Sequence, residues 1–408
     1  MGFNVSLSGI NAANTDLSVT ANNVANVNTT GFKQSRAEFA DLFASTSYGL
    51  SKNQTGSGVR VSNVAQQFIQ GHNEQTGRSL DMAISGEGFF TMNMNGSRVY
   101  SRAGNFQTDS AGYVVNPQGA RLQVFAPNAD GTNFDAGRLV DLQLLTTDSP
   151  PKQTSEVKVG FTLPANAKQP TVATFDPADS NSYNHSSGGI TVYDSLGVSH
   201  IQVSYFVKGA NPNEWTVRNY VDGQPAGAPT PVTFDNSGKL VAPANGKVSL
   251  GTFTPTTGAG QLNMTLDISG STQYGEKFAL RNTQQDGYAA GKLNEVTVSE
   301  SGVVYARYSN GDDKPLGQVA LTTFNNTQGL ESKGNNLWVE TFESGTPRTG
   351  MPDTSNLGKI QAGSLEASTV DLTEQLVNMI TAQRNFQANA QMITTQDQIT
   401  QTVINIRW

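Results

Sequence analysis

Residues 1–30, MGFNVSLSGINAANTDLSVTANNVANVNTT, contain the pattern on which the fold prediction depends. Apolar residues recur in this stretch in steps of 4, 3, 7, 4 and 3. They are Phe3, Leu7, Ile10, Leu17, Ala21 and Val24, and Asn14 occupies the missing heptad position. This spacing predicts an amphipathic helix with one narrow apolar seam. Gly31 is placed to end the helix by adopting a left-handed conformation.

The other end of the chain repeats the same steps. Its seam consists of Leu372, Leu376, Met379, Phe386, Ala390 and Ile393, with Gln383 at the gap. Asp371 is placed to cap this second helix, and Glu374 stands where a capping box needs it. In coiled coils a polar residue at an inward heptad position, here Asn14 or Gln383, fixes register or partner number. The alternative is that both residues simply face water.

Two matching helices could close an ordinary globular core as a hairpin, or they could form the interface of a polymer. Short isolated helices are marginal in water, so helices with one narrow stripe each need further neighbours. Asp16 is the only charged side chain before Lys33, which suits dense packing of many copies around one axis. We therefore favour self-assembly, and the predicted self-assembly residues are Phe3, Leu7, Ile10, Asn14, Leu17, Val24, Leu372, Leu376, Met379, Gln383, Phe386 and Ile393.

The composition excludes several classes of function. The 408 residues include 26 Lys and Arg against 33 Asp and Glu, and this net charge of −7 argues against nucleic-acid or anionic-membrane partners. There is no cysteine, which excludes disulfides, thiolate nucleophiles and Cys-ligated metals. No apolar run reaches the ~20 residues of a membrane span, and the amino end does not resemble a secretory signal. We expect no membrane insertion, and a chain that stays inside the cell or leaves by another route.

Between the helices the apolar period changes to two. Ile201, Val203, Tyr205 and Val207 alternate with His200, Gln202, Ser204 and Phe206, which predicts a half-buried strand. Similar strands are predicted at 190–193, 215–220, 303–308, 319–323 and 337–342. The predicted fold is multidomain and mainly β, with barrel- or sandwich-like domains nested by insertion. The paired N- and C-terminal helices form a coiled-coil-like inner domain.

Turn-rich stretches indicate the domain limits. Proline-rich residues 149–177 and the polar segment 282–291 bound an inserted outer β domain at 151–284. An inner β domain then combines 71–150 with 285–364, and the helical inner domain combines 1–30 with 365–408. Residues 31–70 have apolar anchors at Phe32, Phe39, Leu42 and Phe43, followed by a small, polar run. We expect this segment to be a flexible connector.

The chain contains no motif for catalysis or cofactor binding. It lacks Gly-x-Ser-x-Gly, His-Glu-x-x-His and Gly-x-Gly-x-x-Gly, and none of its Gly-Lys pairs completes a phosphate loop. The three histidines are far apart in sequence, and His200 is expected to be a solvated strand residue. We expect no catalytic residue, no metal, no cofactor and no enzymatic activity.

Residues 21–33, ANNVANVNTTGFK, closely resemble the amino-terminal signature of the bacterial flagellar rod and hook proteins. Residues 88–90 with 100–106 resemble the first β-domain motif of this family, and 363–398 resembles its carboxy-terminal helix. The strands around 190–194 resemble the outer domain of the hook members, which the shorter rod members lack. The signature positions are Asn22, Asn23, Asn26, Gly31, Phe32 and Lys33.

The resemblance implies a structural subunit of the flagellar hook. Such subunits polymerise into a flexible curved tube, a universal joint that transmits torque from rod to filament and encloses the export channel. The implied partners are the chain itself as a helical homopolymer, the distal rod protein, the hook-filament junction proteins, the hook cap protein and the flagellar type III export machine. Export by that machine would place the protein outside the cell without a cleaved signal peptide.

Two other assignments stay open. A distal-rod-like axial protein of the same family would build straight rods, and connector length, here residues 44–58, separates rod from hook in the family. A Thr- and Asn-rich extracellular adhesin would also be mainly β, but such proteins usually carry a signal peptide and need no paired terminal heptads.

Overall fold

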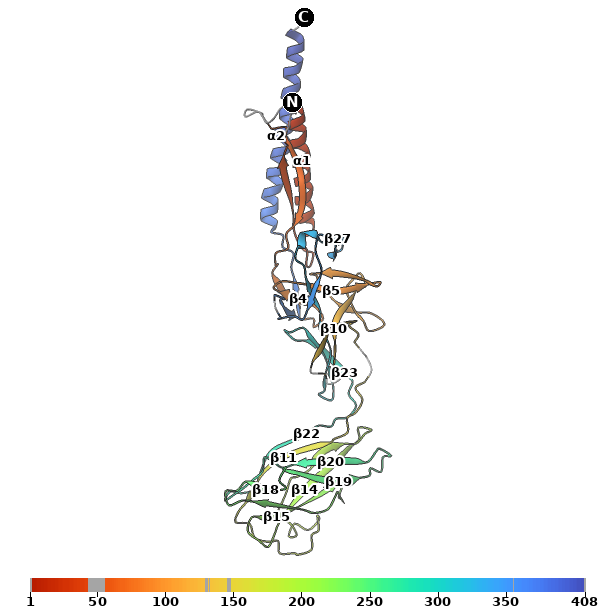
Figure 1. The fold of residues 1–408 in the computed structure, drawn as a ribbon, viewed down its shortest axis with the longest axis vertical. Coiled ribbons are helices and arrows are strands. Elements are labelled where there is room, and N and C mark those ends of the chain that lie inside the picture. Colours follow the sequence, from red (N-terminus) through yellow and green to blue (C-terminus); the bar gives the residue numbers. More distant parts are fainter. Residues whose placement is uncertain are drawn as a thin grey trace. The chain divides into compact units, whose positions relative to one another are not determined.

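The computed structural model describes residues 2–42, 56–128, 131, 133–144, 148–354 and 356–406. The chain divides into two compact units. The first consists of Met1–Thr146, Glu295–Ala306 and Lys314–Trp408, and the second of Thr147–Asn294 and Arg307–Asp313. Both units are built mainly from strands, and the two long helices belong to the first (Figure 1). The predicted fold class is therefore confirmed.

The two helices lie at the ends of the sequence, as predicted. α1 spans Gly2–Ala25 and α2 spans Leu372–Ile406. Asp371 caps α2, because its Oδ1 accepts hydrogen bonds from the backbone N–H groups of Thr373 (2.8 Å) and Glu374 (3.2 Å). Gly31 does adopt a left-handed conformation, with φ of 68°, but in the turn that follows α1 rather than at the helix end.

A β-hairpin occupies much of the segment that the sequence predicts to be a flexible connector. β1 (Ser35–Asp41) pairs antiparallel with β2 (Val59–Gln66), with a bulge between Glu38 and Phe39. Both strands contact α1, and Ala37 and Ala65 are buried. A two-stranded ribbon is marginal alone, so the helix supplies support that a local pattern cannot reveal. Residues 43–55, including Phe43 and most of the 44–58 run, lie outside the described residues.

The β part of the first unit surrounds a core that includes Phe90, Leu122 and Val319. Its largest sheet follows the order β23-β24-β25-β9-β5-β6-β28-β27, with β10 and β8 beside β9, β7 beside β8, β26 beside β5, and β29 beside β26. The ladders β3-β31 and β4-β30 pair segments from either side of the insertion. The bounds are β3 Asn73–Gln75, β4 Met82–Ser85, β5 Phe89–Met94, β6 Ser97–Ser101, β7 Gln107–Thr108, β8 Val114–Val115, β9 Arg121–Pro127, β10 Phe134–Asp141, β23 Leu293–Val298, β24 Val303–Tyr308, β25 Asp313–Val319, β26 Leu321–Thr323, a 3-10 turn Thr327–Gly329, β27 Glu331–Gly334, β28 Leu337–Val339, β29 Arg348–Gly350, β30 Lys359–Ala362 and β31 Ser364–Glu366.

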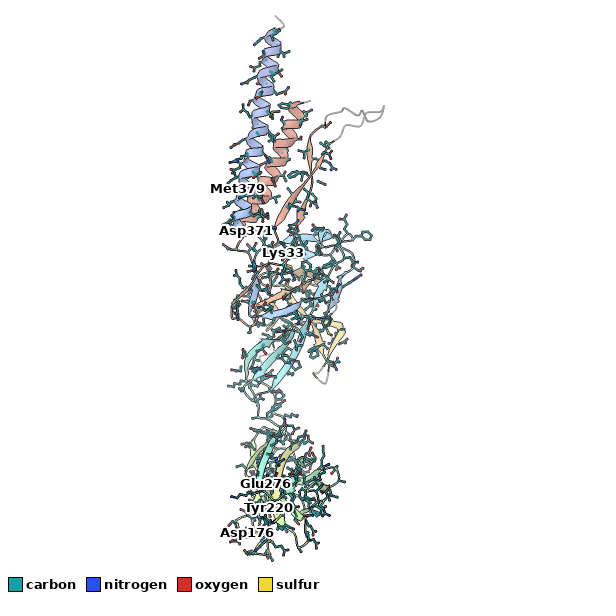
Figure 2. All side chains as sticks on the ribbon, turned by 90° about the vertical axis from the view of Figure 1, so that its left-hand side faces the viewer. Lys33, Asp176, Tyr220, Glu276, Asp371 and Met379 are labelled. Atoms are coloured by element: carbon teal, nitrogen blue, oxygen red, sulfur yellow. The ribbon has the colours of Figure 1, made fainter. Side chains whose placement is uncertain are left out.

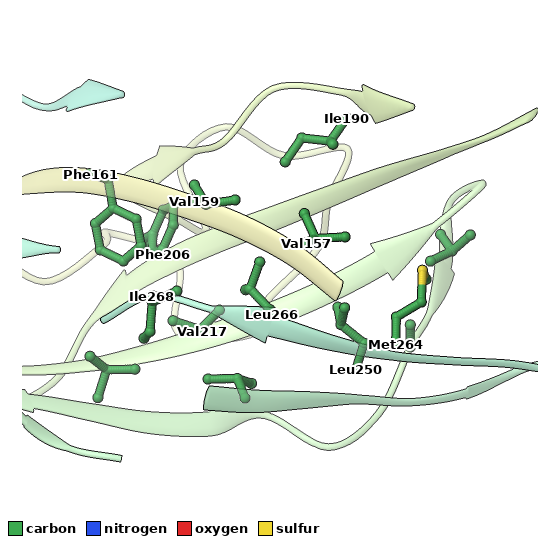
Figure 3. Close-up of a cluster of buried hydrophobic side chains, with 14 of the residues drawn as sticks. Val157, Val159, Phe161, Ile190, Phe206, Val217, Leu250, Met264, Leu266 and Ile268 are labelled. Carbon is green, nitrogen blue, oxygen red and sulfur yellow. The ribbon is translucent and has the colours of Figure 1, made fainter. Parts of the chain in front are cut away.

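The second unit packs two sheets around one apolar core (Figure 3). One sheet follows the order β19-β20-β11-β21, with β22 beside β11, and the other follows β12-β14-β15-β17-β18, with β13 beside β14 and β16 beside β15. Trp215, Phe206 and Phe161 are fully buried between them. The bounds are β11 Glu156–Pro164, β12 His185–Ser186, β13 Ile190–Tyr193, β14 Ser199–Lys208, β15 Glu214–Val221, β16 Gln224–Pro225, β17 Thr230–Phe234, β18 Leu240–Ala242, β19 Lys247–Phe253, β20 Leu262–Asp267, β21 Thr272–Tyr274 and β22 Ala279–Gln285.

Strand β14 buries the face opposite to the one that its apolar residues suggest. Ile201 is 57% exposed, whereas Gln202 and Ser204 are fully buried. Gln202 Nε2 donates to Ser204 Oγ, and Ser204 Oγ donates to Asn219 Oδ1, both at 2.8 Å. Tyr205, on the outer face, packs against other aromatic rings. Partners that are distant in sequence thus override the local pattern.

The predicted strand at 337–342 is shorter in the structure. β28 ends at Val339, and Phe342 lies in an exposed turn beyond it. The strand predicted at 319–323 is divided between the end of β25 and β26.

His200 is buried rather than solvated, contrary to expectation. Its Nδ1 lies 2.6 Å from Asp222 Oδ2 and its Nε2 lies 3.4 Å from Asp194 Oδ2. Burial alone would lower its pKa, but the hydrogen bonds to Asp222 and Asp194 outweigh this effect and raise the pKa above its ordinary value. His185 differs, because it stacks on Phe278 with ring centroids 4.6 Å apart and its burial lowers its pKa.

We predict that the two histidines titrate on opposite sides of the ordinary value of 6.5, with the pKa of His200 above it and that of His185 below it. The His200 ion pairs then stabilise the second unit fully below pH 6.5, and this contribution disappears as the pH rises through the raised pKa. Proton NMR titration of the imidazole signals measures both pKa values, with His200→Gln and His185→Gln giving the assignments. A His200 pKa at or below the ordinary value would contradict the prediction.

Candidate self-assembly site

The two terminal helices pack side by side in opposite directions (Figure 1). Near the end of α1, Asn23 Nδ2 donates a 3.0 Å hydrogen bond to Gln375 Oε1 near the start of α2. Near the start of α1, Gly9 lies against Asn389, and a Cβ on Gly9 would come within 2.5 Å of the Asn389 amide oxygen. Glycine at this position therefore permits the close approach of the helices.

The face of α1 that is buried within the subunit is small and polar. Ser6, Ala13 and Thr20 recur every seven residues and are 6%, 7% and 3% exposed. On α2 the buried residues are Gln375 and Ala382. These buried residues are not the ones that the apolar pattern marks. α1 packs against α2 and also against β1 and β2.

The predicted self-assembly residues are exposed or half-buried in the subunit. The exposed ones include the largest side chains of both seams, with Phe3 at 51%, Leu376 at 45% and Phe386 at 40%. The exposed set is Phe3, Leu7, Asn14, Leu372, Leu376, Gln383 and Phe386, and the half-buried set is Ile10, Leu17, Val24, Met379 and Ile393. Much of both predicted seams therefore stays exposed to solvent in the subunit. Their role in assembly remains a prediction.

α2 also extends beyond the start of α1. Because the helices are antiparallel and Gly9 lies beside Asn389, α1 begins opposite about residue 396. The last turns of α2 carry Ile399, Val403 and Ile406, which are 53%, 60% and 77% exposed. This end of α2 has no α1 residue beside it to cover these side chains.

The signature residues form the joint between the helices and the β part of the first unit. Asn23 holds both backbone groups of Ser35: its Nδ2 donates to Ser35 O (2.8 Å) and its Oδ1 accepts from Ser35 N–H (2.9 Å). Asn26 Nδ2 donates to Asn22 O at 2.9 Å near the end of α1. The half-buried Phe32 accepts a 3.2 Å hydrogen bond at its carbonyl from Thr369 N–H, just before α2.

A buried cluster of charges lies at the centre of this joint. Lys33 Nζ lies 2.7 Å from Glu366 Oε1, and Arg102 Nε lies 3.2 Å from Glu366 Oε2. The side chains of Lys33 and Glu366 are 1% and 0% exposed. Lys33 also donates to the carbonyl of Ile69, and Glu366 Oε1 accepts a 2.7 Å hydrogen bond from Gly71 N–H. Figure 2 shows Lys33 near Asp371, at the base of the helix pair.

Gly31 brings the chain close enough for this cluster to form. Its N–H donates a 2.8 Å hydrogen bond to the carbonyl of Glu366. A Cβ at this position would lie 2.6 Å from the backbone nitrogen of Ala103, next to Arg102. The positive φ and the close backbone approach both require glycine.

Burial determines the electrostatics of the cluster. Removal from water lowers the pKa of Lys33, although the nearby Glu366 carboxylate opposes that shift. Burial likewise lowers the pKa of Arg102, against the attraction of Glu366 and Glu87. One carboxylate thus serves two cations, so Glu366 is the residue on which the cluster depends.

Sequence reasoning missed Glu366, Arg102 and Gln375 as functional partners. Arg102 and Glu366 both lie in stretches that resemble family motifs, but nothing local indicates that they meet Lys33. A useful signal is available: charged residues are scarce, at 14% of the chain, so a charge within a motif is unusual here.

The described residues contain no group of three or more His, Asp or Glu side chains that could hold a metal ion. Among the same residues, no helix is long and apolar enough to cross a membrane.

Comparison with known proteins identifies the family. Residues 3–33 match the family described as flagella basal body rod protein, 83–174 the flagellar hook protein FlgE/F/G D1 domain, 162–288 the flagellar basal body protein FlaE D2 domain, and 361–406 the flagellar basal body rod FlgEFG protein C-terminal region. The chain is 38% identical over 421 residues to the flagellar hook protein FlgE of Salmonella typhimurium, with 100% of both chains covered. The chain belongs to the flagellar hook protein family.

Other hook proteins agree with this assignment. The chain is 38% identical to FlgE of Escherichia coli K12, with both chains covered completely, and 32% identical to FlgE of Borreliella burgdorferi, with 98% of each covered. The crystal structure of Helicobacter pylori flagellar hook protein FlgE2 shares the fold, with a TM-score of 0.53 at 18% identity, and covers 72% of this chain and 100% of its own. The protein belongs to the flagellum.

We predict that Glu366→Gln destabilises the first unit by about 3–5 kcal/mol, because it removes the carboxylate that pairs with both buried cations. Lys33→Met should cost less, since Arg102 still neutralises Glu366. Urea unfolding combined with hydrogen exchange at residues 31–37 and 364–370 measures both effects.

Glu331→Gln in the exposed strand β27 is the matched control and should change little. Equal effects of Glu366→Gln and Glu331→Gln would show that the buried cluster does not hold the joint together.

Proposed function

We propose that this chain is a structural subunit of the bacterial flagellar hook that polymerises through its terminal helices. The observation that carries the proposal is that the largest apolar side chains of both seams stay exposed although the two helices pack against each other within the subunit. Membership of the hook protein family supports the same function.

The exposed apolar side chains of the seams are unfavourable in water, so burying them against another protein surface is favourable. Phe3, Leu7, Leu376 and Phe386 are each 40% or more exposed, and they recur at helical spacing on long helices. Contiguous apolar surface of this kind is typical of protein interfaces. Copies of the chain provide the matching surface, because each copy carries one seam on α1 and one on α2. Repetition of that contact builds a polymer.

The weak charge of the helices favours many copies around one axis. α1 carries one charged residue, Asp16, and α2 carries Glu374, Arg384 and Asp397 within its described length. Burial raises the pKa of the Asp16 carboxyl. Repulsion between identical subunits is therefore small.

Each part of the chain then has its own mechanical role in the tube. The helical domain, 1–30 with 365–408, provides the stiff inner layer that lines the export channel. The connector at 31–70, the inner β domain at 71–150 with 285–364, and the outer domain at 151–284 form the wall. Their weakly charged Asn, Gln and Thr surfaces exchange water-mediated contacts at small energy differences. Such a tube bends while it transmits torque.

The remaining parts of the proposal concern partners and location. The chain contacts the distal rod protein at one end of the tube, and the hook cap and hook-filament junction proteins at the other. It leaves the cell through the flagellar type III export machine without a cleaved signal peptide. It acts as a structural protein and not as an enzyme, and it needs no cofactor.

We predict that Leu17→Asp abolishes tube formation, because a charge in the seam must be desolvated at every subunit contact. Leu17→Ala should weaken assembly by about 2–5 kcal/mol per buried site. Electron microscopy and sedimentation of the purified full chain measure the polymer, and circular dichroism checks that the β domains remain folded.

Ser18→Asp places the same charge one residue away, at an exposed position outside the seam. This control should leave assembly largely intact. Normal tubes from Leu17→Asp would contradict assembly through the seam, and straight rods from the unaltered chain would assign it to the rod.

A further inference from the structure

Phe342 is the most exposed large apolar side chain in the described part of the protein. Its exposure is 102%, which means that its ring contacts nothing in its own subunit. Single exposed apolar residues are common on protein surfaces. Phe342 differs from them because of the turn that presents it.

The turn at residues 340–345 is held rigidly by hydrogen bonds. Thr341 Oγ1 donates to Gly329 O and accepts from the backbone N–H of Glu343 at 3.1 Å, while Ser344 Oγ donates to Thr341 O at 2.8 Å. Ahead of the ring, Tyr100 OH donates a 2.8 Å hydrogen bond to Glu340 Oε2. A rigid base lowers the entropy lost when a partner binds. The ring is thus preorganised as an anchor.

The anchor is acidic on both sides. Glu340 and Glu343 flank Phe342 and are exposed. A surface that receives this turn should therefore combine an apolar floor with positive charge at its rim.

One hollow on the first unit has this chemistry. It has a volume of about 470 Å³ and is lined by the half-buried Leu139 and the exposed Arg98 and Arg138, with the buried Phe125 at its edge. Both arginines are exposed, and neither has an ion-pair partner among the described residues. The hollow is lined by residues of an irregular stretch of β10, where the pairing with β9 shifts between Phe134 and Leu139. Irregular strands of this kind often redirect side chains at functional sites.

We propose that the Phe342 turn of one subunit docks into the Arg98/Arg138 hollow of a second copy of this chain. The inference rests on the proposed self-assembly and adds a second contact, between β domains, to that of the helices. The ring lies against Leu139, and Glu343 pairs with Arg138. Because the anchor and the hollow are different surfaces, the contact is heterologous, and its repetition propagates an open helical filament provided that the rotation between subunits does not close a ring.

Cross-linking tests the contact directly, since the chain contains no cysteine. The double variant Phe342→Cys with Leu139→Cys, assembled and treated with a short bis-maleimide, should give a ladder of covalent oligomers. Neither single variant should give a ladder beyond dimers, and the double variant kept as monomer should give none. Assembled polymer without a ladder would overturn the docking.

Charge exchange tests the pairing. Phe342→Ala should raise the critical concentration for assembly roughly tenfold or more without changing the unfolding of the monomer. Glu343→Arg and Arg138→Glu should each raise it, and their combination should restore it. Glu331→Arg is the control, with the same change of charge on an exposed strand.

Failure of the combined variant to restore assembly, with both single variants impaired, would overturn the Glu343 and Arg138 pair. Unchanged assembly of Phe342→Ala would overturn the anchor while leaving assembly through the helices intact. Absence of polymer from the unaltered chain would instead contradict the proposed function, and the docking contact with it.

Discussion

The carboxylate of Glu366 is the constraint on which the rest of the first unit depends. It lies out of water between Lys33 and Arg102, and it joins the segment after α1 to the segment before α2. Desolvating such groups is costly, so the arrangement persists only because each charge has a close partner. Gly31 and Gly71 bring the backbone within hydrogen-bonding distance of the same residue. The direction of the helices relative to the β part of this unit is therefore set by polar contacts with defined geometry.

The two helices bury one set of residues and expose another. Ser6, Ala13 and Thr20 are small side chains buried on α1, and Gly9 permits the close approach of α2 at Asn389. The largest apolar side chains of both predicted seams stay exposed in the subunit. A subunit that buried its own seam would gain stability alone but lose the driving force for association. Under the proposed assembly, the exposed seams lower the stability of the single chain and raise that of the polymer.

The sequence predicts the elements of this fold better than their contacts. The helices, the Asp371 cap and strand β13 follow from periodicity and capping, which are local properties. The buried face of β14 did not follow, because Ser204 is satisfied by Asn219, which lies on another strand. The hairpin of β1 and β2 was missed for a similar reason, since α1 supports it. The Lys33 cluster depends on partners in three separate segments, and no window of sequence contains them together.

The separation of Lys33 from Glu366 has a kinetic consequence. The two residues are 333 positions apart, so their contact closes almost the whole chain into one loop. The entropic cost of closing a loop rises only slowly with its length, and the second unit has its own core and can fold beforehand. A chain delivered from its amino end nevertheless holds Lys33 without its anion until residue 366 of 408 has arrived. The joint between the helices and the β part of the first unit therefore forms only after that residue has arrived.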